Sequence, residues 1–229
     1  MIKSGIDQDA LIAQFTQATA RQGEALRQAV CEATLKALQG RELTLTNIKS
    51  VLKSVTDAAS AGTAKSGLPT PDAEAMLAKA LDGMDAAVLQ AVEANRRALQ
   101  QFVDMGADLT ETRMKKALSD LDKMEDAMFD TVAKAMTGAT GPVQDAWANA
   151  LKAARMEGSD AGARAADTIA QLTEQARSSV RSGRAASLNA AKALMDGYAA
   201  MVSGVLIGMA EGMQQTPAAK AAPRKTAKK

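Results

Sequence analysis

The chain has 229 residues, of which 47% are hydrophobic and only 2% aromatic, and its 28 basic and 26 acidic residues give a formal net charge of +2. Alanine dominates, and 16 Gly and 5 Pro residues are too few to punctuate a set of β-hairpins, so the composition argues against a β-sandwich or barrel. The absence of His and the single Cys remove the commonest general base, the commonest metal ligand and any intramolecular disulfide.

These numbers predict an all-α protein whose long amphipathic helices form a bundle or an elongated array. The N-terminal sequence MIKSGIDQDALIAQF has one Lys and no continuous apolar segment, which is unlike a secretory signal. Cytoplasmic localisation is therefore the expectation, with granule association as a further option.

Residues 1–60 are predicted to form an N-terminal helical pair. The first helix is expected from Asp7 to Gln39, with Gly40 as its C-cap, and the second over TLTNIKSVLKSVTDAAS. Residues 61–71 are rich in Gly, Ser, Thr and Pro, which is typical of a linker. We therefore expect the N-terminal pair to be separate from a long-helix bundle or array over residues 72–214.

A long heptad pattern follows this linker. Thr70 and Pro71 are suited to the start of a helix. Apolar positions then alternate spacings of four and three, with Asn95 as the polar exception: Leu77, Leu81, Met84, Val88, Ala91, Asn95, Ala98, Phe102, Met105 and Leu109. Asn95 either fixes the register of a helix pair or is an exposed accident.

The pattern changes phase after residue 109, which predicts a break near Gly106. A second apolar series then contains Met114, Ala117, Leu121, Met124, Met128, Thr131 and Ala135. Pro142 is expected to open another helix, EGSDAG to bend it, and a final helix to run from Ala185 to Met213.

The sequence contains no recognisable catalytic motif. Its best candidate for a metal site is an acidic group made of Asp120, Asp122, Glu125, Asp126 and Asp130. A solvated helix face with Glu111–Lys115 and Asp130–Lys134 pairs is the simpler interpretation. Cys31 lies in an apolar helical pattern and is expected to be a small buried hydrophobic residue. We expect no enzyme activity, cofactor, metal or small-molecule substrate.

The most apolar segment is GYAAMVSGVLIGMAEGM, residues 197–213. Its uncharged run, 197–210, is shorter than the roughly 20 residues that span a bilayer. Small residues recur every four positions, at Ala200, Gly204, Gly208 and Gly212, beside a broad apolar surface of Met195, Tyr198, Val202, Val205, Leu206 and Met209. The helix is either the buried centre of a bundle or a docking helix for an apolar body or a second copy.

The C-terminal residues 215–229 are Ala-, Lys- and Pro-rich and are predicted to be disordered. Their five positive charges are Lys220, Arg224, Lys225, Lys228 and Lys229. This tail could aid solubility, touch an anionic surface, or make weak, salt-sensitive contact with nucleic acid through its phosphates.

The segments AGARAADTIAQLTEQARSSVRSGRAASLNAAKALMDGYAAM and AAKAAPRKTAKK resemble phasins, the helical proteins that coat bacterial polyhydroxyalkanoate granules. Some phasin-like proteins use such tails on DNA. The N-terminal segments RQGEALRQAV and IKSVLKSVTDAAS look like an uncharacterised proteobacterial helical family. The resemblance implies a coat-forming role and transfers no catalytic residues.

Two functional hypotheses follow. In the first, a non-enzymatic protein associates with a granule or membrane surface through amphipathic helices, with strength set by buried apolar area. In the second, the chain is a self-associating helical scaffold, with nucleic-acid contact through the tail as an option.

Overall fold

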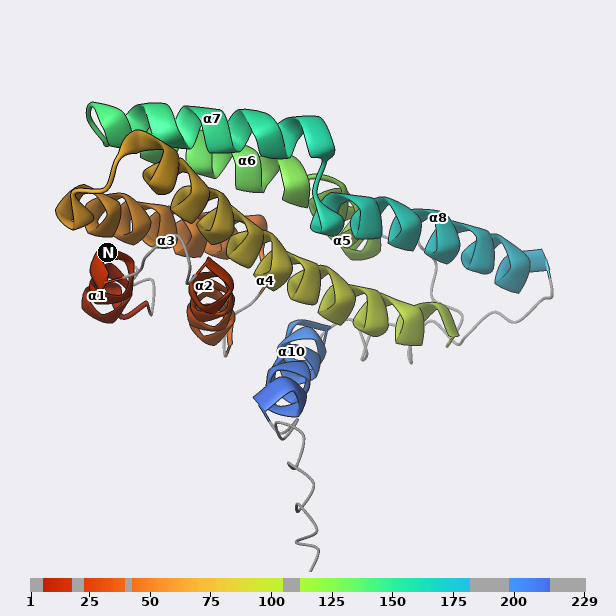
Figure 1. Ribbon diagram of the computed structural model, residues 1–229. Coiled ribbons are helices and arrows are strands. Elements are labelled where there is room, and N and C mark those ends of the chain that lie inside the picture. Colours follow the sequence, from red (N-terminus) through yellow and green to blue (C-terminus); the bar gives the residue numbers. More distant parts are fainter. Residues whose placement is uncertain (1–5, 18–22, 40–42, 105–111, 182–197, 215–229) are drawn as a thin grey trace, which may run out of the picture.

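The computed structural model describes residues 6–17, 23–39, 43–104, 112–181 and 198–214, and all regular structure within these ranges is α-helical. The all-α prediction is therefore confirmed, while the tail 215–229 lies outside the described residues. The helices, shown in Figure 1, are α1 (Gln8–Gln17), α2 (Gly23–Leu38), α3 (Leu45–Ser66), α4 (Thr70–Asp104), α5 (Thr112–Asp122), α6 (Met124–Met136), α7 (Pro142–Glu157), α8 (Asp160–Arg181) and α10 (Tyr198–Gln214).

The long helix α4 is the axis of the bundle. Helices α7 and α8 pack along it, α2 and α10 pack across it, and α1 and α6 pack on α3 (Figure 1). α7 and α8 follow one another along α4 and run parallel to it. Their side-chain contacts with α4, from Glu74–Asn149 to Gln100–Gln175, join residues that are 71 to 76 positions apart in sequence. One register thus holds over most of the length of α4.

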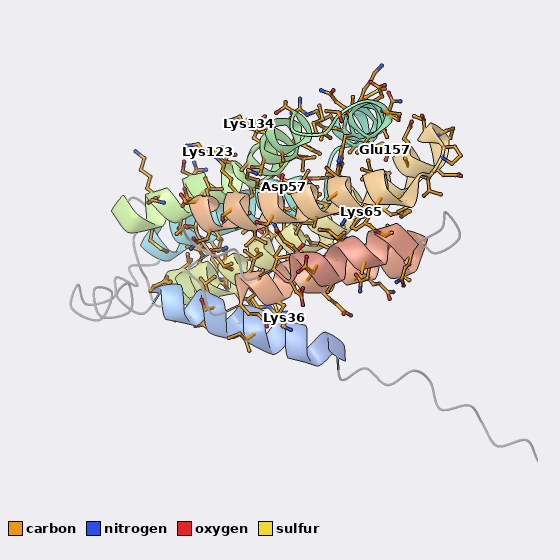
Figure 2. All side chains as sticks on the ribbon, turned by 90° about the vertical axis from the view of Figure 1, so that its left-hand side faces the viewer. Lys36, Asp57, Lys65, Lys123, Lys134 and Glu157 are labelled. Atoms are coloured by element: carbon orange, nitrogen blue, oxygen red, sulfur yellow. The ribbon has the colours of Figure 1, made fainter. Side chains whose placement is uncertain are left out.

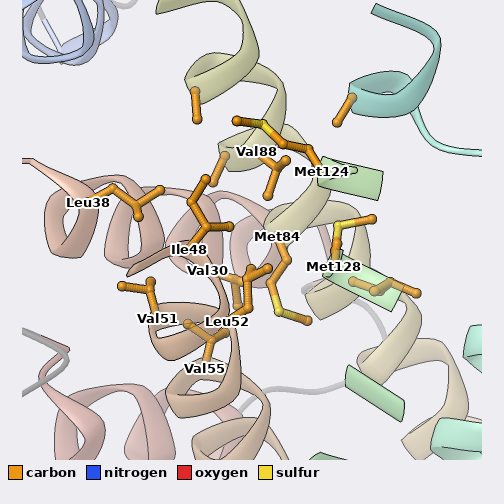
Figure 3. Close-up of a cluster of buried hydrophobic side chains, with 14 of the residues drawn as sticks. Val30, Leu38, Ile48, Val51, Leu52, Val55, Met84, Val88, Met124 and Met128 are labelled. Carbon is orange, nitrogen blue, oxygen red and sulfur yellow. The ribbon is translucent and has the colours of Figure 1, made fainter. Parts of the chain in front are cut away.

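A single apolar core joins the helices from α1 to α10. Figure 3 shows its centre, where Val30 of α2, Leu52 of α3, Met84 of α4 and Met128 of α6 approach one another. The heptad positions from Leu77 to Phe102 are all buried, as predicted. Because this core is continuous, the N-terminal helices are not packed as a unit apart from the rest.

The linker prediction for residues 61–71 was wrong over most of its length. Helix α3 continues to Ser66, and only residues 67–69 separate it from α4. Gly62 is buried, and a Cβ atom added there would lie 2.3 Å from the Cβ of Phe15 and 2.9 Å from the carbonyl oxygen of Ile12. Gly62 is therefore the point where α1 crosses α3 closely. The turn itself uses Gly67, whose φ of 62° is left-handed.

The prediction of one helix from Asp7 to Gln39 was also wrong. Helix α1 packs mainly on α3, whereas α2 packs mainly on α4. Each contact uses a glycine of the partner helix: Phe15 meets Gly62, and Val30 meets Gly83. α1 and α2 are separate helices that lie side by side and contact each other, so they are not consecutive parts of one straight helix, although their apolar spacing is similar (Figure 1). Gly40 lies outside the described residues.

The second half of the chain is divided more finely than predicted. α5 and α6 are separate helices around Lys123, and α7 ends at Gly158, so the predicted bend at EGSDAG is a full break. Pro142 opens α7 as expected. The predicted break near Gly106 lies in undescribed residues between α4 and α5. Residues 185–197 of the predicted final helix are likewise undescribed, and α10 begins at Tyr198.

Candidate interaction surfaces

Charged side chains lie around the outside of the bundle, as Lys36, Lys123, Lys134 and Glu157 illustrate (Figure 2). In the described ranges, His, Cys, Asp and Glu side chains form no group of three that could hold a metal ion. Most of the acidic group proposed from the sequence has other contacts. Lys116 Nζ lies 2.5 Å from Asp120 Oδ2, and Asp130 pairs at 3.4 Å with Arg155 of α7 rather than with Lys134.

An open pocket of about 440 Å³ lies between α6 and α7. It is lined by Glu125, Asp126, Phe129, Asp130, Arg155 and Gly158. The guanidinium of Arg155 is 5.7 Å from the centre of the Phe129 ring, a cation–π arrangement, and it also pairs with Asp130. These contacts join α7 to α6, and we attribute the pocket to the packing of these two helices.

Two sequence predictions concern single polar residues. Asn95 is buried, and its side-chain Nδ2 donates to the Ala91 carbonyl at 2.8 Å, so the exposed interpretation was wrong. Cys31 is half-buried among apolar neighbours, and this burial raises the pKa of its thiol. A raised pKa keeps the less reactive, protonated thiol at neutral pH.

Helix α10 is the most apolar helix in the described chain, and it packs on α4 by one side. Val202 and Leu206 are buried there, while Gly204 and Gly208 are exposed on the opposite side, about 200° around the helix. In the part of the chain that the structure describes, no atom beyond the helix's own backbone lies within 4 Å of a Cβ added at either glycine. The small-residue face therefore points away from the bundle, and α10 is not its buried centre.

The other residues predicted for this surface are only partly described. Val205 and Met209 are partly exposed, as are Met201 and Ile207 on the same helix. Tyr198, Ala200 and Gly212 belong to α10, but their side chains lie outside the described part, as do Met195 and the tail cations. None of the helices that the structure describes is long and apolar enough to cross a membrane.

A second feature, which sequence reasoning missed, is a polar seam between α4 and α8. We define it by Asp85, Glu93, Gln100 and Asp104 on α4 and by Arg164, Gln175 and the first turn of α8. The Asp85 carboxylate accepts from the backbone N–H groups of Asp160 and Ala161, at 3.0 and 3.2 Å. A carboxylate at a helix N-terminus opposes the helix dipole favourably. Burial is nevertheless the larger effect and raises the pKa of Asp85.

The middle of the seam is ionic. Arg164 of α8 and Arg96 of α4 both contact the Glu93 carboxylate, the latter at 2.9 Å. Burial alone would raise the pKa of Glu93, but the hydrogen bonds from both guanidiniums lower it below its ordinary value. Farther along, Gln100 Nε2 donates to Gln175 Oε1 at 2.6 Å, and Gln175 Nε2 donates to Asp104 Oδ1 at 2.7 Å.

Apolar contacts hold α8 only lightly. Among its described apolar side chains, Ala161, Ala165 and Leu172 are fully buried, and together they contribute about 3–5 kcal/mol. The Thr168 hydroxyl is buried without a hydrogen-bond partner, which costs roughly 1–3 kcal/mol. Helix α7, six residues shorter, buries Trp147 together with Val143, Ala146, Ala150 and Leu151.

The junction between α7 and α8 has a distinct geometry. Gly158 has a φ of 79°, and no described atom beyond its two chain neighbours lies within 4 Å of a Cβ added there. The next residue, Ser159, donates its N–H to the Glu125 carboxylate of α6 at 2.9 Å. A conformation that favours glycine and two flanking carboxylates thus set the direction of α8.

The polar seam could not be predicted from the sequence. Charged residues of helices are usually solvated, and a single sequence does not show which of them contact one another in the fold. Residues 1–215 match the model of a family of unknown function (DUF6781). The chain belongs to this family. Neither the curated proteins nor the solved structures contain a match. The family region includes every described helix and ends before the five tail cations.

Proposed function

We propose that this family member is a non-enzymatic helical protein that binds an apolar surface, such as a polyhydroxyalkanoate granule or the surface of a membrane, through α10. The observation that carries the proposal is that α10 is the most apolar described helix, yet Val202 and Leu206 bury only one of its sides. An apolar helix gains free energy when its remaining side is also removed from water. The resemblance of residues 161–229 to phasins is consistent with this role.

The other helices offer little surface of this kind. Their apolar faces form the continuous core, and the only large hydrophobic side chain that stands fully exposed in the described chain is Met156. As long as the bundle stays closed, α10 is the helix best placed to make first contact with an apolar surface.

Self-association is the second candidate, and the outward position of Gly204 and Gly208 favours it. Without side chains at these positions, the backbone of another helix can approach closely, as in Gly-xxx-Gly pairs. A scaffold of this kind would form a defined oligomer and would not bind polymer or lipid.

Co-sedimentation of the full chain with polyhydroxybutyrate particles and with liposomes tests the first candidate. The double variant Gly204→Lys/Ile207→Lys places two charges on the outer side of α10, at positions with room for them. Ala148→Lys is the matched control, because it adds a charge at an exposed alanine of α7. We expect the double variant to lose particle binding and the control to keep it.

Equal binding of the double variant and the unmodified chain would exclude α10 as the binding surface. Sedimentation velocity of the same proteins without particles separates the two candidates. A concentration-dependent oligomer that the double variant abolishes, in a chain that ignores both particles and liposomes, would establish self-association instead.

A further inference from the structure

The two halves of the layer above α4 are held in different ways. Trp147 anchors α7, since its ring is fully buried and its indole Nε1 donates to Ser60 Oγ of α3 at 2.8 Å. α8 buries only small side chains and Leu172 fully, and its other described contacts with α4 are largely those of the polar seam. Water can replace each seam contact when the helices separate, so these contacts add little net free energy to the closed state. The contacts that hold α8 in its closed position are therefore weaker than those that hold α7.

The chain also has a pivot at the boundary between these halves. A Cβ added at Gly158 would meet no described atom beyond its chain neighbours within 4 Å, and the residue already has a positive φ. Helix α7 can stay on the core while α8 rotates about Gly158 and Ser159. Opening breaks the seam contacts of Asp85, Glu93 and Gln175, and among the described large apolar side chains of α8 it removes the buried Leu172 and the partly buried Ile169 from the core.

We propose that α8 is a hinged helix that swings away from α4 about Gly158 and Ser159 while α1–α7 stay packed. Opening uncovers the apolar strip of α8, formed by Ala161, Ala165 and Leu172, together with the part of α4 beneath it. This inference rests on the proposed function, because an apolar surface contacted by α10 would bind the open state and shift the equilibrium toward it. The seam keeps the strip covered when no such surface is present.

Hydrogen exchange of the full chain, followed peptide by peptide, tests the hinge. We expect amides of α8 to exchange at least about tenfold faster than those of α7, because a helix that has left α4 loses the tertiary packing that keeps it folded, and its amides exchange from the open state. A bridged variant is the decisive comparison. In a Cys31→Ala background, Gln100→Cys and Gln175→Cys are joined by a short bismaleimide, since a direct disulfide would need Cα atoms within about 7 Å.

The bridge should slow exchange in α8 to the level of α7. A matched control joins Glu74→Cys of α4 to Asn149→Cys of α7. These two residues are also 75 positions apart and hydrogen-bonded to each other, but they lie on the α7 side of the hinge. This control bridge should leave exchange in α8 fast. Equal protection of α7 and α8 in the unmodified chain, or an α8 rate that neither bridge changes, would overturn the hinge.

The same experiment with polyhydroxybutyrate particles keeps the two proposals apart. Particle binding by a chain whose α8 is as protected as α7, both free and bound, would refute the hinge and leave the binding role of α10 standing. Fast exchange in α8 without any particle or liposome binding would refute the binding role and leave the hinge standing. If both are right, particles should increase exchange or reagent access at the α4 face beneath α8 in the unmodified chain and not in the bridged one.

Discussion

Gly62→Ala provides the sharpest test of how the N-terminal helices are packed. In an exposed helix, Gly→Ala stabilises by about 1 kcal/mol because Ala loses less backbone entropy. At Gly62 the new methyl group would lie 2.3 Å from the Cβ of Phe15, so α1 must move away from α3. Overpacking of this kind costs about 1–3 kcal/mol, and partial exposure of the Phe15 ring adds roughly 1–2 kcal/mol.

The net expectation is that Gly62→Ala lowers the free energy of unfolding by about 1–4 kcal/mol. For a chain of this size, each kcal/mol corresponds to roughly 2–4 °C in Tm. Urea and thermal unfolding followed by far-ultraviolet circular dichroism measure the effect. Gly204→Ala is the matched control, because its added methyl meets no atom within 4 Å and should stabilise α10. If Gly62→Ala is as stable as Gly204→Ala, then α1 does not cross α3 at this glycine.

Four further predictions concern the polar seam, the α7 anchor and the tail. Folding lowers the pKa of Glu93, so its carboxylate stabilises the fold above the ordinary pKa of Glu, and this stability is lost as pH falls through the pKa in the folded chain. Glu93→Gln should therefore be less stable than the unmodified chain near neutral pH and equally stable in acid. The raised pKa of Asp85 has the opposite effect on stability: its protonated carboxyl group stabilises the fold at low pH, and this stability is lost as pH rises through the pKa in the folded chain. Asp85→Asn should therefore lose no stability at neutral pH in urea titrations. Trp147→Phe should cost about 1–2 kcal/mol through the lost hydrogen bond to Ser60 and the space left by the indole, measured by chemical unfolding, and an unchanged midpoint would contradict the anchoring role. Deleting residues 220–229 should abolish any DNA retardation in low salt, and retardation that survives the deletion would place the contact elsewhere.

The parts of the fold that were predictable are those in which apolar spacing alone decides the structure. The heptad positions of α4 from Leu77 to Phe102 are all buried, because a heptad pattern places its residues on one face of a long helix. Pro142 starts α7 for an equally local reason, since proline fits the first turn of a helix.

Other features depend on contacts between distant residues, which a single sequence does not reveal. Gly62 and its Ser- and Thr-rich neighbours look like a loop by composition, but the glycine is the place where another helix approaches. Glu93 and Arg164 resemble solvated helix charges, and only the packing of α8 on α4 makes them partners. The outward direction of Gly204 depends in the same way on which side of α10 meets α4.

The shared register of α4 with α7 and α8 restricts how chains of this family can change length. Because the paired residues stay 71 to 76 positions apart from Glu74 to Gln175, adding one residue inside α4 would turn its later part by about 100° and separate the pairs beyond that point. Such an insertion would be tolerated only with a matching one in α7 or α8. We therefore expect insertions and deletions among related sequences to collect between these helices, and any inside them to occur in compensating pairs.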